Sequence, residues 1–407
     1  MNRSGKIVAA MLGVLLLAVT VSAVAETIDE WLQRAALGDY GAEAQDWDAI
    51  IAAAKEEGTL VVYTSSSRTF LAGDSFWDEY GIDAQIFDLG STGSLSKMIS
   101  EYDAGRHASD VIMTGGSEYV FRAIPEGMIY TFVPSTVADY LPEQYKSPAL
   151  FQRLSLGGIL YNTEANPDGP PIDNIWDLTT PEWKSRVTLK DPLTSESTFN
   201  YISNLVNHHE ELLAAYELEY GTLEYTGGRE NAGYELIYRV LKNDPVLQSS
   251  SENVAKAVGE PGQENPPISF YVGTSKLTLN QTAGLVNAIA DISPVDVQVG
   301  ETYVGISAFA PHPNAAKLWI RWVMGTPEPV ELGLTDLIPP YHTGENGRML
   351  QGFSPWFGPG NANPMLGYPK AQGAISLDPP TQVWPLDMEF IWQNALDIQD
   401  FWLINGG

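Results

Sequence analysis

Residues 59–67 have the sequence TLVVYTSSS, and this segment is the strongest indication of the fold class. Its first five residues are almost continuously apolar and rich in β-branched and aromatic side chains, which is typical of a strand buried on both faces of a parallel sheet. Before it, residues 47–57 carry apolar side chains at helical spacing, and Gly58 follows as a left-handed cap. The pattern predicts an amphipathic helix, then a buried strand, then a turn of hydroxylic residues.

The same order of strand and polar turn occurs twice more. Residues 85–89 (QIFDL) lead into 90–94 (GSTGS), and residues 110–113 (DVIM) lead into 114–117 (TGGS); a helix is predicted after each turn. Three such units connected by helices predict an α/β fold with a parallel sheet. Because the loops at the carboxyl ends of parallel strands meet in one crevice, we expect the binding site there.

The hydroxyl-rich turns have two interpretations. Ser, Thr and Gly at the start of a helix offer hydroxyl and backbone N–H groups, which suit a polar or anionic ligand. Alternatively, each Ser or Thr caps only its own helix. One hydroxyl is enough for a cap and each turn holds more than one, so the pattern leaves both interpretations open.

Composition limits the function classes. The 407-residue chain contains no Cys, and 22 Lys and Arg residues against 51 Asp and Glu residues give a formal net charge of -29. The length favours two domains, with three as the alternative. The missing Cys excludes disulfides, thiolate metal sites and a Cys nucleophile. The negative charge argues against a nucleic-acid partner and suits a protein kept soluble in a saline medium.

The first 25 residues are predicted to be a cleaved signal peptide. Arg3 and Lys6 precede an apolar stretch at 7–21, and the small residues 23–25 (AVA) provide a cleavage site. An N-terminal membrane anchor is the alternative, because the apolar stretch is nearly long enough to span a bilayer. The well-placed cleavage site favours an exported, soluble mature chain.

The second half of the chain repeats the pattern of strand and polar turn. Residues 187–192 form a predicted strand that leads into the turn 193–198 (LTSEST), and residues 268–272 (ISFYV) form another predicted strand. Glu196 is unusual in such a turn. It either meets a cation or a metal or faces solvent, and solvent is the simpler interpretation.

Several segments of the chain resemble segments of one protein family and occur in the same order. They are 53–66, 110–117, 176–178 with 183–184, 187–198 and 310–318. With them the chain resembles the periplasmic solute-binding proteins of ABC importers, in the family of the ferric-iron-binding proteins and their relatives for phosphonates, thiamine and polyamines. The resemblance implies a type II α/β fold of two lobes, each a mostly parallel sheet flanked by helices, which close over a ligand by a hinge motion.

The resemblance also implies a division of the chain in which the polypeptide crosses between the lobes. The expected parts are the signal peptide at 1–25, the first part of lobe 1 at 26–150, lobe 2 at 151–290, a return to lobe 1 at 291–345, and a Gly- and Pro-rich segment (352–380) with a C-terminal helix within 346–407.

The family's function is implied in the same way. The chain is expected to capture a small solute, either anionic or oxyanion-bearing or a ferric complex, in the cleft between the lobes. It would deliver this solute to the transmembrane subunits of a permease that is driven by a separate ATPase. The expected protein is a periplasmic monomer that is not an enzyme, needs no cofactor and binds no nucleic acid.

The resemblance places candidate ligand contacts in both lobes. Tyr271 lies near the position where many members have an aromatic ligand contact. Iron-binding members use two adjacent tyrosines, and this sequence has no Tyr-Tyr pair, so Tyr271 is the single phenol offered to a ferric ion. The other candidates are Ser65, Ser66, Ser67, Gly90, Ser91, Gly115, Gly116 and Ser117 in the first lobe and Thr194, Ser195, Ser197 and Thr198 in the second.

Two other classes remain as alternatives, a secreted hydrolase and a sugar-binding protein on the same architecture. None of the five His residues lies in a metal-binding spacing, and the sequence contains neither G-x-S-x-G nor G-x-x-x-x-G-K. Trp356, in its Gly- and Pro-rich surroundings, is the tryptophan least explained by core packing and is a candidate for stacking on a sugar. The residues favour binding over catalysis.

Overall fold

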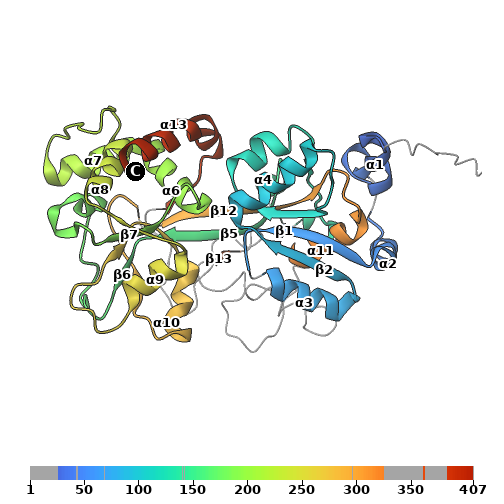
Figure 1. Cartoon of the computed structure of the whole chain (residues 1–407), viewed down its shortest axis with the longest axis horizontal. Coiled ribbons are helices and arrows are strands. Elements are labelled where there is room, and N and C mark those ends of the chain that lie inside the picture. Colours follow the sequence, from blue (N-terminus) through green and yellow to red (C-terminus); the bar gives the residue numbers. More distant parts are fainter. Residues whose placement is uncertain are drawn as a thin grey trace, which may run out of the picture.

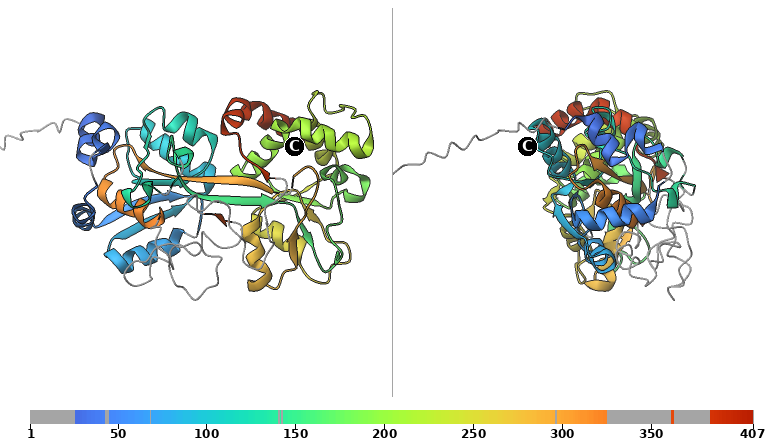
Figure 2. Two further views of the ribbon diagram at one scale, coloured as in Figure 1. Left: turned by 180° about the vertical axis from the view of Figure 1, so that it is seen from behind. Right: turned by 90° about the vertical axis from the view of Figure 1, so that its right-hand side faces the viewer.

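Two lobes lie side by side and are joined by two long strands (Figure 1). The same two strands are seen to run from lobe to lobe when the molecule is viewed from behind (Figure 2). The computed structural model describes residues 26–42, 45–67, 69–139, 141, 143–295, 297–324, 361–362 and 383–406.

The sheet of the first lobe contains the apolar segment 59–64 as a strand. β1 (Thr59–Thr64) lies between β2 (Asp83–Asp88) and β3 (Val111–Thr114), and both pairings are parallel. The flanking helices are α2 (Trp47–Glu57), α3 (Thr69–Tyr80), α4 (Gly90–Asp103) and α11 (Pro313–Met324). The predicted α/β class, with parallel strands connected by helices, is confirmed.

Aromatic packing fixes α3 and α11 against this sheet. The rings of Phe76 and Trp319 are fully buried, with their centroids 5.2 Å apart, and Leu60 and Val62 of β1 belong to the same apolar cluster. Each such buried side chain contributes about 1.5–3 kcal/mol relative to an exposed one. This packing holds β1 in place and therefore fixes where its carboxyl end and the following turn lie.

Two long strands connect the lobes, β5 (Leu150–Gly158) and β12 (Val297–Ser307). They pair with each other antiparallel along almost their whole lengths. At one end β12 pairs with β3 of the first lobe, and at the other end β5 pairs with β10 (Val272–Gly273) of the second lobe. One mixed sheet, in the order β10-β5-β12-β3-β1-β2, therefore extends from one lobe into the other.

The second lobe has a small parallel sheet of its own. β7 (Val187–Lys190) lies between β8 (Val246–Gln248) and β9 (Ile268–Ser269). The prediction of one strand over 268–272 is wrong, because β9 pairs within this lobe whereas β10 pairs with the connecting strand β5. The helices of this lobe are α6 (Glu196–Asn207), α7 (His209–Tyr220), α8 (Ala232–Lys242), α9 (Ser251–Gly259) and α13 (Met388–Gly406).

The remaining described elements are short. They are α1 (Ile28–Ala35), α5 (Ser135–Ala138), α10 (Thr278–Thr282), β4 (Ile129–Tyr130), β6 (Leu160–Asn162), β11 (Asn287–Ile289), β13 (Asn361–Ala362), β14 (Val383–Trp384), η1 (Gly38–Ala42), η2 (Tyr119–Ala123), η3 (Glu143–Tyr145), η4 (Ile175–Thr179), η5 (Pro181–Trp183) and η6 (Thr274–Leu277). Within the described ranges, every helix is too short or too polar to cross a membrane. The predicted signal peptide, Trp356 and most of 352–380 lie outside the described residues.

Candidate functional site

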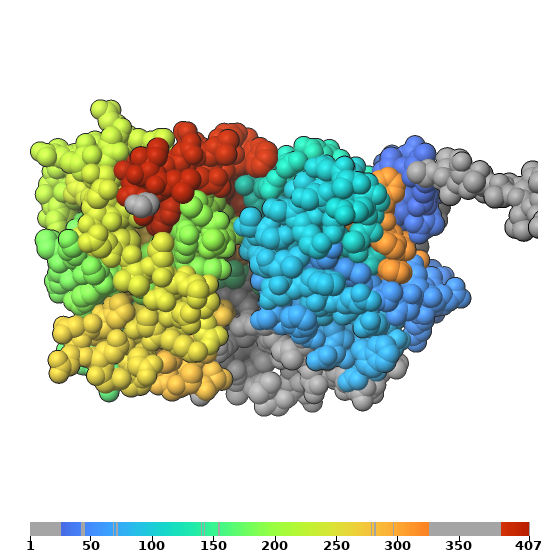
Figure 3. Space-filling view, viewed as in Figure 1, coloured from blue at the N-terminus to red at the C-terminus, as the bar shows by residue number. Residues whose placement is uncertain are grey.

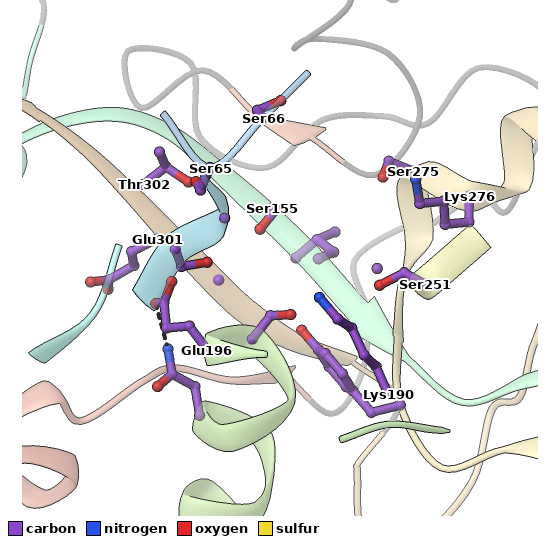
Figure 4. Close-up of a pocket in the computed structure, with 18 of the residues that line it drawn as sticks. Ser65, Ser66, Ser155, Lys190, Glu196, Ser251, Ser275, Lys276, Glu301 and Thr302 are labelled. Atoms are coloured by element: carbon purple, nitrogen blue, oxygen red, sulfur yellow. Dashed lines mark hydrogen bonds between the residues drawn. The ribbon is translucent and has the colours of Figure 1, made fainter. Parts of the chain in front are cut away.

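A cavity of about 490 Å³ lies between the two lobes. In the space-filling view the surface is hollowed along the boundary between them (Figure 3). The lining comes from turns and helix starts of both lobes and from the connecting strands β5 and β12 (Figure 4). The carboxyl ends of β1, β2 and β7 meet here, which is the usual position of a binding site in a parallel sheet.

Seven of the predicted contact residues line this cavity. They are Ser65, Ser66, Ser67, Gly90, Ser91, Ser197 and Tyr271. In the turn after β1, the Thr64 hydroxyl accepts a hydrogen bond from the Ser66 backbone N–H at 3.2 Å and lies 2.8 Å from the Thr69 hydroxyl. Within the described chain, the hydroxyls of Ser65 and Ser66 form no hydrogen bond. Thr64 shapes this turn, and its serine hydroxyls remain available to a ligand.

Three predicted residues line a neighbouring cavity of about 440 Å³ instead. They are Gly115, Gly116 and Ser117. This second cavity has a largely apolar lining that includes Leu95, Phe199 and Trp392, the last of which belongs to the C-terminal helix α13. Glu196 lines both cavities. The turn after β3 therefore does not line the main cavity itself. It affects that cavity through Glu196, which lines both cavities.

The other three predicted residues, Thr194, Ser195 and Thr198, line neither cavity. The Thr198 hydroxyl donates to Ser195 Oγ at 3.0 Å, and the Thr194 hydroxyl donates to the Asp191 carbonyl at 3.2 Å. These groups stabilise the turn that begins α6, which is what the capping interpretation predicts. Of this turn's hydroxyls, Ser197 alone lines the main cavity.

Two turns that were predicted as loops belong partly to helices. Residues 90–94 form the first turn of α4, and α6 begins at Glu196. Gly and Ser disfavour a helix locally. Ser94 is buried, and its hydroxyl donates to the Thr64 carbonyl at 2.7 Å, so contact with the end of β1 stabilises the helical turn. As a result, Ser91 is presented to the cavity from a helix start.

Two glutamates converge on one side of the cavity (Figure 4). Glu196 comes from the start of α6 and Glu301 from the connecting strand β12, and both are half-buried. Glu196 accepts a hydrogen bond from Asn200 Nδ2 at 3.0 Å, and the Tyr303 hydroxyl donates to Glu301. The interpretation that Glu196 faces bulk solvent is wrong, because the start of α6 turns its side chain into the interlobe cavity.

Gly115 makes room for this pair of glutamates. A Cβ at position 115 would lie 2.6 Å from Glu196 Oε1 and 2.5 Å from the Glu301 carbonyl oxygen. Both distances are shorter than a real Cβ contact. The turn after β3 therefore acts on the site by close backbone approach.

Burial raises the pKa of both carboxyl groups. The pKa of Glu196 rises to about 7 because of desolvation, although its hydrogen bonds and the charge of Arg153 act in the opposite direction. The pKa of Glu301 also rises to about 7, mainly because of desolvation and further because of the charge of Glu196, while the hydrogen bond from Tyr303 opposes the rise. Both groups therefore change charge near neutral pH.

We expect the stability of the ligand-free protein to fall as the pH rises through 7. The pKa of each glutamate is about 7 in the folded state against 4.5 for an ordinary carboxyl, so the folded state binds more protons than the unfolded state between these values. This stabilisation is fully present below pH 4.5 and is lost above pH 7. Thermal melts across this range, with a Glu196→Gln, Glu301→Gln variant as control, test it. An equal pH slope in the variant would contradict this assignment.

Three cations also line the cavity, and sequence reasoning missed all of them together with Glu301. They are Arg153, Lys190 and Lys276. Figure 4 shows Lys190 and Lys276 on the side opposite Glu196 and Glu301. Lys190 is the last residue of β7. The expectation that the carboxyl ends of parallel strands lie at the binding site, which identified the serines, therefore also applied to Lys190. For Glu301 the available signal was a charged residue inside the apolar strand β12.

The ring of Tyr271 forms a wall of the cavity. It stacks on Tyr201 with centroids 4.7 Å apart and planes at 22°, and its hydroxyl end lies against Gly157, where a Cβ would overlap the phenol. Burial raises the pKa of Tyr271, and the charge of Glu196 adds to this rise. The phenol is therefore held in its neutral form, which disfavours the phenolate that a ferric ion requires.

Solved structures resemble this chain, although no protein-family model and no curated protein sequence matches it. The periplasmic binding protein P5PA is 17% identical with a TM-score of 0.60, over 86% of this chain and 100% of P5PA. Iron-bound HitA from Pseudomonas aeruginosa is 18% identical with a TM-score of 0.58, over 84% of this chain and 99% of HitA. AfuA from Actinobacillus pleuropneumoniae, solved with exogenous fructose-6-phosphate, is 15% identical with a TM-score of 0.59, over 86% of this chain and 98% of AfuA.

These similarities extend over both lobes. The chain has the two-lobe fold of periplasmic binding proteins, and the expected type II architecture is confirmed. Proteins of this fold include an iron-bound and a sugar-phosphate-bound example. The fold alone therefore leaves the ligand to be inferred from the side chains in the cavity.

Proposed function

We propose that this protein is the solute-binding component of an ABC importer, which captures a small polar solute between its lobes. The observation that carries the proposal is the interlobe cavity itself. It is lined by polar side chains from both lobes and from the strands that connect them. A ligand in this position contacts all three parts at once.

The connecting strands give the protein a way to close. β5 and β12 are the long segments shared by the two lobes, so bending within them changes the opening of the cleft. A ligand that contacts both lobes makes more contacts in the closed form, and therefore shifts the population toward it. The closed, ligand-bound form is the one that we expect to dock on the permease.

The cavity side chains favour a solute with an anionic or oxyanion-bearing group. Serine hydroxyls in the turn after β1 and the ammonium of Lys190 are suitable donors for such a group. HitA is iron-bound and AfuA is fructose-6-phosphate-bound, so ferric complexes and phosphorylated solutes belong in the test. Direct phenolate ligation by Tyr271 alone is less favourable, since its pKa is raised.

The rest of the proposal concerns the cellular setting. We propose a non-catalytic periplasmic monomer that needs no cofactor and delivers its solute to permease transmembrane subunits, which are coupled to a separate ATPase. The confirmed fold and the exported chain expected from residues 1–25 support this setting. A high negative charge supports the absence of a nucleic-acid partner.

A thermal screen with small solutes tests the proposed function. A ligand that binds only the folded state stabilises it by about 2.7 kcal/mol at a concentration of 100 times Kd. We therefore expect one class of solute to raise the melting temperature by about 5 °C. Turnover of a chromogenic ester or glycoside, without a thermal shift from any solute, would favour the hydrolase alternative instead.

A further inference from the structure

Within the described part of the chain, the two glutamates of the cleft form no close ion pair. Among the described residues, neither Glu196 nor Glu301 forms an ion pair, although Arg153 acts on Glu196 at longer range. Each carboxylate is half-buried, and the charge of Glu196 acts on Glu301. Two like charges in a partly desolvated cavity repel each other, so a cation placed between them would relieve the repulsion.

A buried amide in the same cavity is also unsatisfied. Gln298 of β12 is 1% exposed and lines the cavity, and neither its Nε2 nor its Oε1 has a hydrogen-bond partner among the described residues. Buried amides are normally hydrogen-bonded, and leaving both atoms unpaired is costly. Gln298 therefore has, independently of the glutamates, an unused donor and an unused acceptor for a polar ligand in the cavity.

The opposite side of the cavity carries positive charge. Lys190 extends into the cavity from the side opposite the two glutamates (Figure 4). Its ammonium makes no ion pair or hydrogen bond within the described chain. Glu252, which also lines the cavity, is already paired with Lys256 at 2.6 Å. An anionic group near Lys190 would therefore meet an uncompensated cation.

We infer that the solute is a zwitterion of the amino-acid type, with its ammonium group between Glu196 and Glu301 and its carboxylate toward Lys190. This inference rests on the proposed function and specifies its substrate class. The ammonium donates hydrogen bonds to both carboxylates, and the carboxylate accepts one from Lys190. Gln298, which lies on the same strand as Glu301, pairs with polar groups of the ligand.

A bare metal ion fits these donors less well than an ammonium group. The described residues contain no group of three or more His, Asp or Glu side chains that could hold a metal. Ca²⁺ takes 6–8 oxygen ligands and Mg²⁺ requires an octahedral set, whereas an ammonium needs only hydrogen-bond acceptors. Two carboxylates therefore suit the organic cation.

Matched probes test the inference on the purified full chain. The probes are α-amino and ω-amino acids of increasing length, and for each one the carboxylic acid without the amino group and the amine without the carboxyl group. We expect at least one zwitterion to raise the melting temperature, and both of its singly charged analogues to bind about thirtyfold more weakly or worse by titration calorimetry. A single-charged analogue that binds as tightly as its zwitterion would overturn the inference.

Charge-removing variants locate the two ends of the ligand. We expect Glu196→Gln, Glu301→Gln and Lys190→Met each to weaken zwitterion binding about thirtyfold or more. Glu143→Gln and Lys146→Met are the matched controls, because these residues form an ion pair at 3.0 Å that does not line the cavity. Unchanged binding in the three cavity variants would contradict the assigned positions.

The same screen separates failure of the inference from failure of the proposed function. If phosphate, sugar phosphates or ferric citrate raise the melting temperature and no zwitterion does, the zwitterion assignment is wrong and the binding function stands. If no solute of any class binds, the proposed function is wrong as well. A visible charge-transfer band with ferric citrate that is lost in Tyr271→Phe would assign the site to iron and overturn the inference.

Discussion

Replacing Gly157 by Ala weakens ligand binding about thirtyfold and destabilises the ligand-free protein by about 1–3 kcal/mol. The Tyr271 ring stacks on Tyr201 and its hydroxyl end contacts Gly157, so a methyl group at 157 displaces the ring into the cavity or against Tyr201. Either movement changes the wall of the binding cavity. Urea unfolding measures the stability change, and calorimetry with the solute found in the thermal screen measures the affinity.

Gly273→Ala is the matched control for this substitution. Gly273 lies directly opposite Gly157 in the β5–β10 pair and lines the same cavity. A Cβ at 273 would come no closer than 3.8 Å to Ser275 Oγ, which is an ordinary contact. We expect the stability of this variant to stay within about 0.5 kcal/mol of the parent. Equal losses of stability in the two variants would mean that any side chain in the β5–β10 pair destabilises the protein, and that displacement of Tyr271 is not the cause.

Replacing Gly233 by Ala costs about 3 kcal/mol of folding free energy. Gly233 lies at the start of α8, where the helix touches the backbone of α6. A Cβ at 233 would overlap the Leu205 carbonyl and would lie 2.5 Å from Val206 Cα. Backbone atoms cannot rotate away as a side chain does, so the two helices must separate. Because α6 also carries Glu196, we expect the affinity for the solute to fall together with the urea midpoint.

Gly93→Ala is the control that separates this packing effect from the general effect of replacing a helical glycine by alanine. Gly93 lies within α4, and a Cβ there would be 3.4 Å from Leu89 Cβ. Gly93→Ala should leave stability unchanged or increase it by up to about 1 kcal/mol, because Ala favours a helix. A loss at Gly93 as large as the loss at Gly233 would contradict the close approach of α8 to α6.

The sequence predicted the parts of the fold that local pattern controls. Residues 59–64 form a buried parallel strand because their apolar side chains leave no polar face, and 47–57 form a helix because their apolar side chains recur on one face. The 268–272 stretch shows where local pattern fails. Its residues favour extended structure throughout, and only the surrounding chain decides that its two ends pair with different sheets.

The site was predictable in part for the same reason. Serines that follow β1 reach the cavity because the carboxyl ends of parallel strands converge. Thr198 does not, since helix geometry turns its hydroxyl to Ser195. Glu301 and Gln298 come from a connecting strand, and the face that such a strand turns toward the cleft depends on its register with β5.

The α/β fold with hydroxyl-rich turns at one edge of its sheet follows from the amino-acid sequence, because strand and helix periodicity are local properties of the chain. Which charges meet in the cleft depends on how the elements pack in three dimensions. Glu196 and Glu301 are distant in sequence, and only the pairing of β5 with β12 and the packing of α6 bring them together opposite Lys190. Their burial, which raises the pKa of both carboxyls, follows from that packing and cannot be inferred from either residue's neighbours in sequence.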